Sequence, residues 1–258
     1  MLISFYYDHI WKFYDKLALC ECSEKITANG GELILYDLSK INLADIKIYY
    51  SQFGILINYI IEQYAYRNLV RAKKGDYVID GGACYGDTAF YFSHLVGEDG
   101  KVFSFEFVDE NLEVFNKNMA LNPHIKNIKI IKRPLYSDSN NVVSYSGVGG
   151  GAHINRNTQD KKSFRTISID EFVEENRIPR IDFIKFDIEG SELEALKGAK
   201  NTLQKYRPRL AICLYHRLSD YVEIPLFLNA ILKDYEFYFD HFTLGLWESV
   251  LFARPKSI

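Results

Sequence analysis

The sequence predicts an α/β protein with a doubly wound, mostly parallel sheet, a final antiparallel hairpin and an N-terminal helical cap. From Gly75 onward, strand-like runs alternate with helical segments, which is typical of a parallel sheet with helices on both faces. Two β-rich runs joined by a short segment with Gly245 follow, and the first 70 residues have a different, aromatic-rich pattern. The parallel strands are expected near 76–80, 101–106, 127–132, 181–187 and 208–215, and the hairpin near 235–241 and 247–252.

The N-terminal part is expected to form a separate cap. Aromatic-rich helical segments at 6–19 and 49–66 flank a short strand-like run at 32–36. We therefore expect a mostly helical cap over residues 1–70 and a main domain over residues 71–258. The aromatic side chains of the cap suit core or lid packing, and they could also wall an acceptor pocket.

Composition favours a globular protein that acts on small molecules. The 258 residues are 48% hydrophobic and 25% charged, with a formal net charge of -3 and no long basic run. This balance argues against nucleic acid or an anionic membrane as a partner and favours a small-molecule or glycan-precursor acceptor. We expect no membrane span and a cytoplasmic location, because an apolar run of about 18 residues and a basic leader are both missing. The four scattered cysteines predict neither disulfides nor zinc.

The most informative stretch is residues 80–86, which read DGGACYG. An apolar run precedes it and a helix is expected to begin near Asp87, so the stretch predicts a ligand-binding loop at the carboxyl end of a strand. Glu106 closes the next strand-like run, in the place where α/β nucleoside sites keep an acid for ribose hydroxyls. The pair predicts a ligand that carries a ribose, although a tight turn that needs glycine would also explain the loop.

The glycine spacing argues against a nicotinamide dehydrogenase. Dinucleotide sites use G-x-G-x-x-G to hold a pyrophosphate at a helix N-terminus, and this loop has only Gly81, Gly82 and Gly86. Asp80 at the start of the turn would repel a diphosphate but suits an amine or a sulfonium. A second glycine run, 147–151, does not lie between a strand and its helix, so we interpret it as a mobile loop and not as a phosphate cradle.

The second motif is residues 181–192, which read IDFIKFDIEGSE. A buried strand delivers Asp187 and Glu189 into the turn before a helix. Ser191 and Glu194 fit a capping box, so we expect Glu194 to close the helix start. Because Asp80 and Asp187 end neighbouring strands of the expected sheet, their side chains should converge where ligands bind in open α/β sheets.

Together these motifs resemble the FkbM family of S-adenosylmethionine-dependent methyltransferases. The family pattern D-x-G-A-x-x-G-x-T matches residues 80–88, and I-D-x-I-K-x-D-x-E-G-x-E matches residues 181–192. The resemblance implies a Rossmann-like class I methyltransferase fold with a seven-stranded sheet. It also implies methyl transfer from S-adenosylmethionine, with S-adenosylhomocysteine as product, usually to a hydroxyl of a sugar, a capsule or lipopolysaccharide precursor, a polyketide or a similar metabolite. One departure is Phe107, where many relatives have proline.

The resemblance also implies roles for individual residues. One acid, Asp80 or Asp187, would hold the methionine amine, Glu106 would bind the ribose hydroxyls, and Asp187 would face the methyl group. The cofactor-binding set is expected to comprise Asp80, Gly82, Ala83, Tyr85, Gly86, Thr88, Glu106, Ser137, Asp138 and Asp187, with Ser137 and Asp138 at the adenine.

A hydroxyl acceptor must lose its proton as the methyl group arrives. His216 ends the fifth strand, and an imidazole suits this task at neutral pH, so we expect His216 to be the general base beside Asp187 and Glu189. A histidine fixed structurally by Asp220 is the alternative, and His241 on the hairpin is the next candidate base. Asp187, Glu189 and His216 could also hold Mg²⁺ or Mn²⁺, but transfer from an already activated sulfonium needs no metal.

Other functions stay open from the sequence. An N-methyltransferase would need no strong base, and a non-catalytic S-adenosylmethionine-binding scaffold would need none of the acceptor-side residues. The sequence also leaves the oligomeric state open, a homodimer included.

Overall fold

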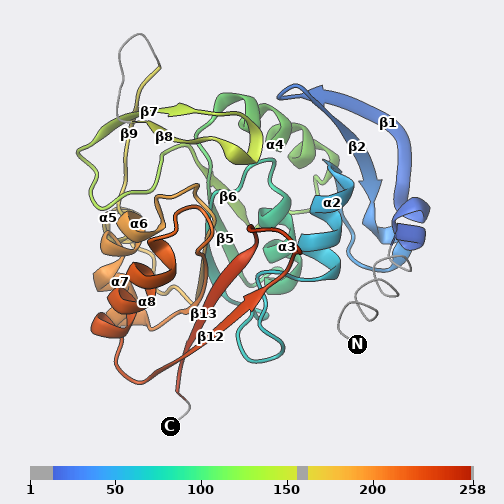
Figure 1. Ribbon diagram of the computed structural model, residues 1–258. Coiled ribbons are helices and arrows are strands. Elements are labelled where there is room, and N and C mark those ends of the chain that lie inside the picture. Colours follow the sequence, from blue (N-terminus) through green and yellow to red (C-terminus); the bar gives the residue numbers. More distant parts are fainter. Residues whose placement is uncertain (1–13, 156–161, 257–258) are drawn as a thin grey trace.

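The structure is a computed structural model that describes residues 14–155 and 162–256 (Figure 1). The start of the predicted helix at 6–19 therefore lies outside the described residues, whereas residues 14–20 are helical. Within the described ranges, none of the helices is both long enough and apolar enough to span a membrane.

A seven-stranded sheet forms the centre of the molecule, and the predicted α/β fold is confirmed. The strands run in the order β12-β13-β11-β10-β4-β5-β6, in which β11, β10, β4, β5 and β6 are parallel and β13 is antiparallel to both neighbours. Their bounds are β4 Tyr77–Gly81, β5 Lys101–Phe105, β6 Ile128–Ile131, β10 Phe183–Phe186, β11 Arg209–Cys213, β12 Tyr235–His241 and β13 Ser249–Pro255. All seven lie close to the predicted runs, but β13 begins after Trp247 and Glu248.

Alternate residues of the central strands face opposite sides of the sheet, as expected for side chains along a strand. Val78 and Phe183 belong to the apolar cluster on one side, which includes Phe90. Ile79 and Ile184 belong to the cluster on the other side. Buried on both faces, these strands read as nearly continuous apolar runs, which is why the sequence revealed them.

Helices cover both faces of the sheet (Figure 1). α3 (Asp87–Val96) and α4 (Asp109–Leu121) pack on the side that also receives the N-terminal segment. The opposite side is covered by α5 (Ile169–Glu175), α6 (Glu192–Lys197), α7 (Lys200–Tyr206) and α8 (Asp220–Ile231). This is the doubly wound arrangement that the alternation predicts.

The prediction of a mostly helical N-terminal cap is wrong for the described residues. β1 (Glu21–Ala28), β2 (Gly31–Asp37) and β3 (Lys47–Tyr50) form a three-stranded antiparallel sheet. Of the predicted N-terminal elements, the strand at 32–36 is confirmed within β2. The helical turns between β2 and β4 are the 3₁₀ turn η1 (Leu38–Ile41), α2 (Gln52–Ile55) and the π-helical turn η2 (Leu56–Ile60).

Two asparagines, Asn118 in α4 and Asn122 directly after it, hold the edge strand of this sheet. The side chain of Asn118 accepts from the backbone N–H of Tyr49 (2.8 Å) and donates to its carbonyl (3.2 Å). Asn122 does the same for Lys47, with distances of 2.8 and 2.6 Å. The outer edge of β3 thus finds hydrogen-bond partners on a helix about 70 residues away, where a single-sequence pattern gives no signal. Tyr36 then packs in the same apolar cluster as the central sheet.

A second small sheet lies beside the carboxyl ends of the parallel strands (Figure 1). It contains β7 (Val142–Ser146), β8 (His153–Asn155) and β9 (Phe164–Arg165), in the order β8-β7-β9. The predicted glycine loop 147–151 joins β7 to β8 and includes the short 3₁₀ turn η3 (Gly149–Gly151). The carbonyl of Gly149 accepts a hydrogen bond of 3.1 Å from Asn111 on α4.

Candidate functional site

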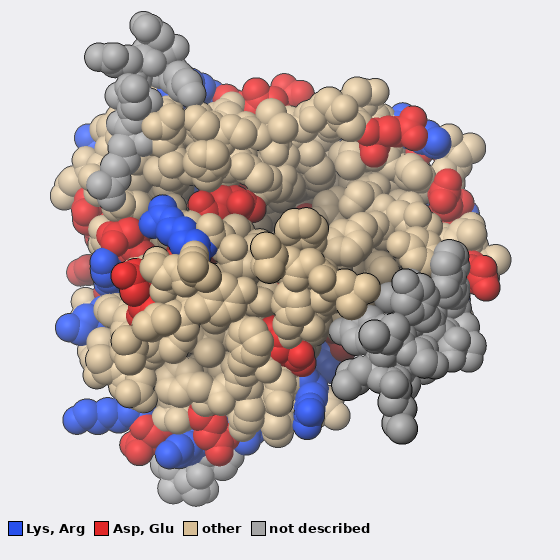
Figure 2. Space-filling view, in the orientation of Figure 1, with Lys and Arg blue, Asp and Glu red and all other residues tan. Residues whose placement is uncertain are grey.

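A pocket of about 390 Å³ opens at the carboxyl edge of the parallel strands. This volume lies within the usual range for small-molecule sites. Figure 2 shows a hollow near the middle of this face, with acidic side chains beside it. The loops after β4, β5, β6, β10 and β11 contribute to the lining, together with η2, the β7–β8 connection and the turn before β13. The lining includes Asn58, Tyr64, Gly82, Asp87, Glu106, Arg133, Gly149, Asp187, Glu189, Tyr215, Trp247 and Glu248.

The loop after β4 can adopt its path only with glycine at two positions. Gly82 has φ 80°, and a Cβ there would lie 1.8 Å from the carbonyl oxygen of Asp187. Gly86 has φ 87°, and its Cβ would meet the ring of Phe115 at 2.4 Å. Because L side chains rarely adopt such φ values, and neither position has space for one, the loop is closely packed against the end of β10. The two sequence motifs therefore meet in space.

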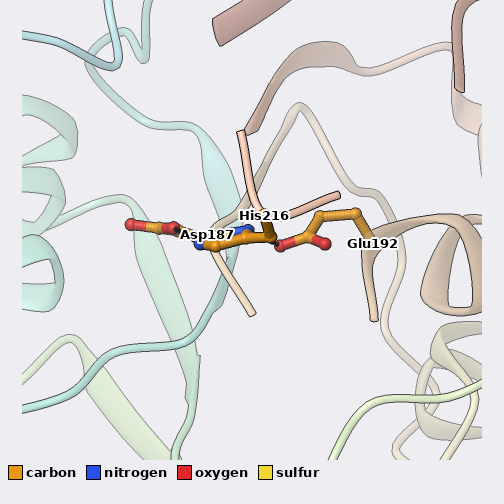
Figure 3. A group of neighbouring side chains, drawn as sticks. All are labelled: Asp187, Glu192 and His216. Carbon is orange, nitrogen blue, oxygen red and sulfur yellow. Dashed lines mark ion pairs between the residues drawn. The ribbon is translucent and has the colours of Figure 1, made fainter. Parts of the chain in front are cut away.

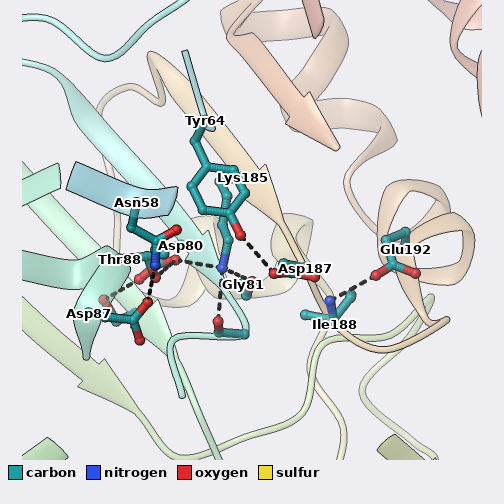
Figure 4. A network of polar contacts seen from close by, with 12 residues as sticks. Asn58, Tyr64, Asp80, Gly81, Asp87, Thr88, Lys185, Asp187, Ile188 and Glu192 are labelled. Carbon is teal, nitrogen blue, oxygen red and sulfur yellow. Dashed lines mark hydrogen bonds and ion pairs between the residues drawn. The ribbon is translucent and has the colours of Figure 1, made fainter. Parts of the chain in front are cut away.

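A fully buried lysine ties these motifs together (Figure 4). Nζ of Lys185, in β10, donates to the carbonyls of Gly81 (3.0 Å) and Gly82 (2.8 Å) and lies 3.3 Å from Oδ1 of Asp80. Burial lowers the pKa of Lys185, but the surrounding carboxylates more than offset this and hold the pKa above its usual value. The ammonium group thus holds the loop in place through these two backbone carbonyls.

Asp80 is not part of the pocket lining, whereas Asp187, the other acid considered for the methionine amine, lines the pocket. The side chain of Asp80 has no solvent exposure. Oδ1 accepts from the hydroxyl of Thr88 (2.8 Å) and Oδ2 from that of Ser104 (3.1 Å), in addition to the Lys185 ion pair. Thr88 does line the pocket. A buried carboxylate needs compensating partners of this kind, and Asp80 finds them on β5, β10 and α3.

Five further residues that were predicted to contact the cofactor lie outside the pocket lining. Three belong to the loop after β4, and two were expected at the adenine. Tyr85 is buried, and its hydroxyl accepts from Asn29 at 2.8 Å. Asp138 accepts from the backbone N–H of Asn140 at 2.9 Å within its own loop. The lining after β6 comes from Arg133, Pro134 and Leu135, upstream of the predicted pair. The predicted residues outside the lining are Ala83, Tyr85, Gly86, Ser137 and Asp138.

Glu106 lies at the end of β5, at the wall of the pocket. Its Oε1 accepts from the backbone N–H groups of Phe107 (2.6 Å) and Val108 (2.8 Å), and Oε2 accepts from Asn111 (3.2 Å). Burial raises the pKa of Glu106 to about 7 in spite of these hydrogen bonds. The position is the one expected for a ribose ligand, and the ribose contact itself stays a prediction.

Asp187 ends β10 and receives two tyrosine hydroxyls. Tyr64 donates to Oδ2 at 2.7 Å and Tyr215 donates to Oδ1 at 2.8 Å. Burial favours the neutral acid, but Lys185 and His216 outweigh it and hold the pKa of Asp187 below its usual value. Asp187 is therefore a fixed negative charge at the centre of the pocket wall.

The structure argues against His216 as the general base. Its ring is buried among carboxylates: Nε2 lies 3.3 Å from Asp187 and 3.4 Å from Glu189, and Nδ1 lies 2.8 Å from Glu192. Figure 3 shows the ring between Asp187 and Glu192. Burial lowers the pKa of His216, but these acids raise it to about 11. A ring that stays protonated at neutral pH cannot accept a proton, and His216 does not line the pocket.

The acids around His216 also bear on the prediction that this part of the pocket could bind a metal ion. Asp187, Glu192 and His216 offer ligand atoms within 4.8 Å of one another, whereas the predicted trio contained Glu189 in place of Glu192. Glu192 also accepts from the backbone N–H of Ile188 at 2.8 Å. The expected capping box is wrong, because Ser191 makes no side-chain cap hydrogen bond and Glu194 pairs with Lys197 instead. We assign the group to an ion cluster, because the imidazolium of His216 lies within 3.4 Å of three carboxylates and offsets part of their charge. Independence from metal stays a prediction.

Glu248 is one of several pocket residues that were missed from the sequence. Glu248 follows Trp247 in the turn before β13, and both line the pocket. Burial and the nearby Asp187 raise the pKa of Glu248 to about 8. The sequence signal was weak, because this acid lies in a hairpin turn outside both motifs. His241, the other candidate base, lies outside the lining, with Nδ1 2.7 Å from Oγ of Ser249.

Comparison with known proteins agrees with the resemblance that the two motifs indicate. The sequence profile of the methyltransferase FkbM domain matches residues 80–239. The hexuronic acid methyltransferase AglP of Haloferax volcanii is 30% identical over 138 residues, which cover 53% of this chain and 55% of the relative. The chain thus matches about half the length of that relative.

A solved structure also resembles this fold. The methyltransferase FkbM of Methylobacillus flagellatus superposes with a TM-score of 0.60 and 21% identity, covering 78% of this chain and 53% of that chain. At this identity the likeness concerns the fold alone.

Proposed function

The chain belongs to the FkbM family of methyltransferases, and from this we propose that it transfers the methyl group of S-adenosylmethionine to a hydroxyl group of a sugar. The observation that carries the proposal is the charge of the pocket. Five acidic side chains line it, namely Asp87, Glu106, Asp187, Glu189 and Glu248. Of the two cations in the lining, Lys185 is buried and already paired.

A pocket of this charge favours a cationic cofactor. S-adenosylmethionine carries a sulfonium and an ammonium group, whereas a dinucleotide would bring a pyrophosphate into the same field. Burial raises the pKa of Asp87 and of Glu106 to about 7, and a bound cation would favour their charged forms. The pocket charge therefore supports the cofactor that the family implies.

The topology supports one orientation of the cofactor. In open α/β sheets a nucleoside binds across the carboxyl ends of the strands, with its ribose at the acid after the second strand of the unit. Glu106 after β5 would then hold the ribose hydroxyls, and the Gly82 turn would approach the methionine part. The methyl group would point toward Asp187 and the neighbouring end of β11. Transfer would rely on proximity and in-line geometry, because the sulfonium is already activated.

The relative AglP supports a sugar as acceptor, since its name describes a hexuronic acid methyltransferase. We propose a hydroxyl of a hexuronic acid or of a related hexose as the methyl acceptor.

Two measurements test the proposal. Calorimetry should show binding of S-adenosylhomocysteine and no appreciable binding of NAD or NADP. Incubation with methyl-labelled S-adenosylmethionine and a panel of uronic acid and hexose glycosides should yield a methylated sugar, and mass spectrometry should place the label on oxygen. Cofactor binding without transfer to any sugar would favour the scaffold alternative, and label on an amide or amine nitrogen would favour N-methylation.

A further inference from the structure

Glu248 lies at the end of the pocket opposite Glu106. β13 begins directly after Glu248 and pairs antiparallel with β11, so its first residue lies at the carboxyl edge of the parallel strands, where Cys213 pairs with Val250. Glu106 follows β5, and the strands β4, β10 and β11 lie between the two positions. If the ribose binds at Glu106, the cofactor occupies that end of the pocket. The acceptor would then bind at the other end, beside Glu248.

The side chain of Glu248 leaves one carboxylate oxygen without a hydrogen bond. Within the described residues, Oε2 of Glu248 is buried and has no hydrogen-bond partner. The backbone has φ 68°, a left-handed conformation that is unusual for a residue other than glycine. The carbonyl of Glu248 accepts from the N–H of Phe242 at 3.0 Å across the hairpin. A strained conformation at a pocket wall is a feature of functional positions.

The other acids near the acceptor side are already occupied. Both oxygens of Asp187 accept from tyrosines, Tyr64 and Tyr215. Glu189 lies 3.4 Å from Nε2 of His216, so its charge is paired. Glu248 differs from both because its oxygen can still accept a hydrogen bond from an incoming hydroxyl group.

We propose that Glu248 is the general base that removes the proton from the acceptor hydroxyl, an inference that rests on the proposed function. As the new O–CH₃ bond forms, the S–CH₃ bond breaks and its electron pair stays on sulfur, which gives the neutral thioether S-adenosylhomocysteine. The O–H bond of the acceptor breaks at the same time, and its proton moves to the carboxylate of Glu248, which lines the pocket. Release of that proton to water restores the carboxylate for the next turnover.

The charges around Glu248 suit this role. Burial and the carboxylates of Asp187 and Glu189 raise the pKa of Glu248, while His216 and Lys185 lower it, and the net result is about 8. A base of this strength is better matched to a hydroxyl than an ordinary carboxylate. The titratable groups that face Glu248 from the neighbouring elements are Tyr64, Lys185, Asp187, Glu189, Cys213, Tyr215 and His216.

The test compares Glu248→Gln, Glu248→Asp and a control, Glu236→Gln, in the full chain. Glu236 is on the same hairpin at its other end, where it pairs with Arg254. Transfer from tritiated-methyl S-adenosylmethionine is measured with methyl β-D-glucuronide, UDP-glucuronic acid and methyl β-D-glucoside as probes. Binding of S-adenosylhomocysteine to each variant is measured by calorimetry, so that folding and cofactor affinity are monitored separately from turnover.

We expect Glu248→Gln to bind S-adenosylhomocysteine as the wild type does and to lose about 10²- to 10⁴-fold in kcat, with little change in KM. The wild-type rate should rise with pH toward a plateau above pH 8, because the base must be deprotonated, and this rise should be absent in Glu248→Gln. Glu248→Asp should recover part of the rate, and Glu236→Gln should match the wild type.

Three outcomes would overturn the inference. The first is a Glu248→Gln protein that keeps a rate within a few-fold of wild type with the same pH profile. The second is a Glu248→Gln protein that loses cofactor binding and stability in parallel with its rate, since that would make the residue structural. Wild-type protein that binds S-adenosylhomocysteine but methylates none of the three probes would overturn the proposed acceptor class, and with it this role of Glu248.

Discussion

Replacement of Lys185 by methionine should destabilise the protein strongly, because this lysine neutralises a buried acid beneath the cofactor loop. The side chain of Lys185 is 1% exposed and that of Asp80 is 0% exposed. Methionine has a similar length but cannot donate, so Asp80 would lose its cation and the carbonyl of Gly82 would lose its 2.8 Å hydrogen bond. The carbonyl of Gly81 would keep its bond from the N–H of Asp187.

The expected loss follows from these contacts. Removal of one partner of a buried ion pair costs about 3–5 kcal/mol, and an unpaired buried carbonyl adds about 1–3 kcal/mol when the two effects are independent. Since both effects share one ammonium group, they are not additive, and we expect a total of about 3–5 kcal/mol. In a chain of this size that corresponds to a fall in Tm of roughly 6–20 °C.

Urea and thermal unfolding followed by circular dichroism measure the effect. The matched control is Lys197→Met, which removes an exposed ion pair with Glu194 and should change stability by about 0–1 kcal/mol. The double variant Asp80→Asn with Lys185→Met should recover about 1–3 kcal/mol, because no uncompensated carboxylate is left. A Lys185→Met protein within about 1 kcal/mol of wild type would refute the structural role of the pair.

Three further predictions concern the site. Glu106→Ala should weaken binding of S-adenosylhomocysteine by about 1.5–3 kcal/mol, roughly 10- to 150-fold, and an unchanged Kd in calorimetry would rule out the ribose contact. Nearby acids raise the pKa of His216 from 6.5 to about 11, so its stabilisation is fully present below pH 6.5 and is lost as pH rises toward 11. Urea unfolding should therefore show wild-type stability falling more steeply over this window than that of His216→Gln, and parallel curves would contradict the assignment. Dialysis against EDTA should leave methyl transfer and Tm unchanged, whereas recovery of activity on adding Mg²⁺ would return Asp187, Glu192 and His216 to the role of metal ligands.

The central fold could be predicted because its signals are local. Each parallel strand carries its own apolar run, and the alternation of strands with helices limits the sheet to one arrangement. The N-terminal sheet could not be predicted in the same way. Its edge strand is completed by Asn118 and Asn122, which follow Tyr49 and Lys47 by 69 and 75 positions. Aromatic residues fit either a helix or a strand until such contacts select one.

The site was predicted in part for a similar reason. Glu106, Asp187 and Glu189 follow strands directly, so the sheet alone brings them to the pocket. The sequence did not reveal the ion pair of Asp80, because Lys185 lies in a different strand. A lysine inside the buried run FIKF was the available signal, since a buried cation requires a carboxylate close by.

The histidine and the missed acid show the limit of motif reasoning. A histidine at a strand end has a useful pKa in isolation, but three carboxylates around His216 change its protonation state. These contacts depend on the turn after β10 and on how the end of β11 packs against it. Glu248 reaches the pocket only because the final hairpin turns back over the end of β11, and no motif marks that position.

The structure of the protein with S-adenosylhomocysteine bound would test the central claim most directly. We predict that the ribose hydroxyls lie within hydrogen-bond distance of Glu106, that the methionine part follows the Gly82 turn, and that the sulfur faces the side of the pocket formed by Asp187 and Glu248. A ribose bound away from Glu106, or a sulfur directed away from Asp187 and Glu248, would contradict the account.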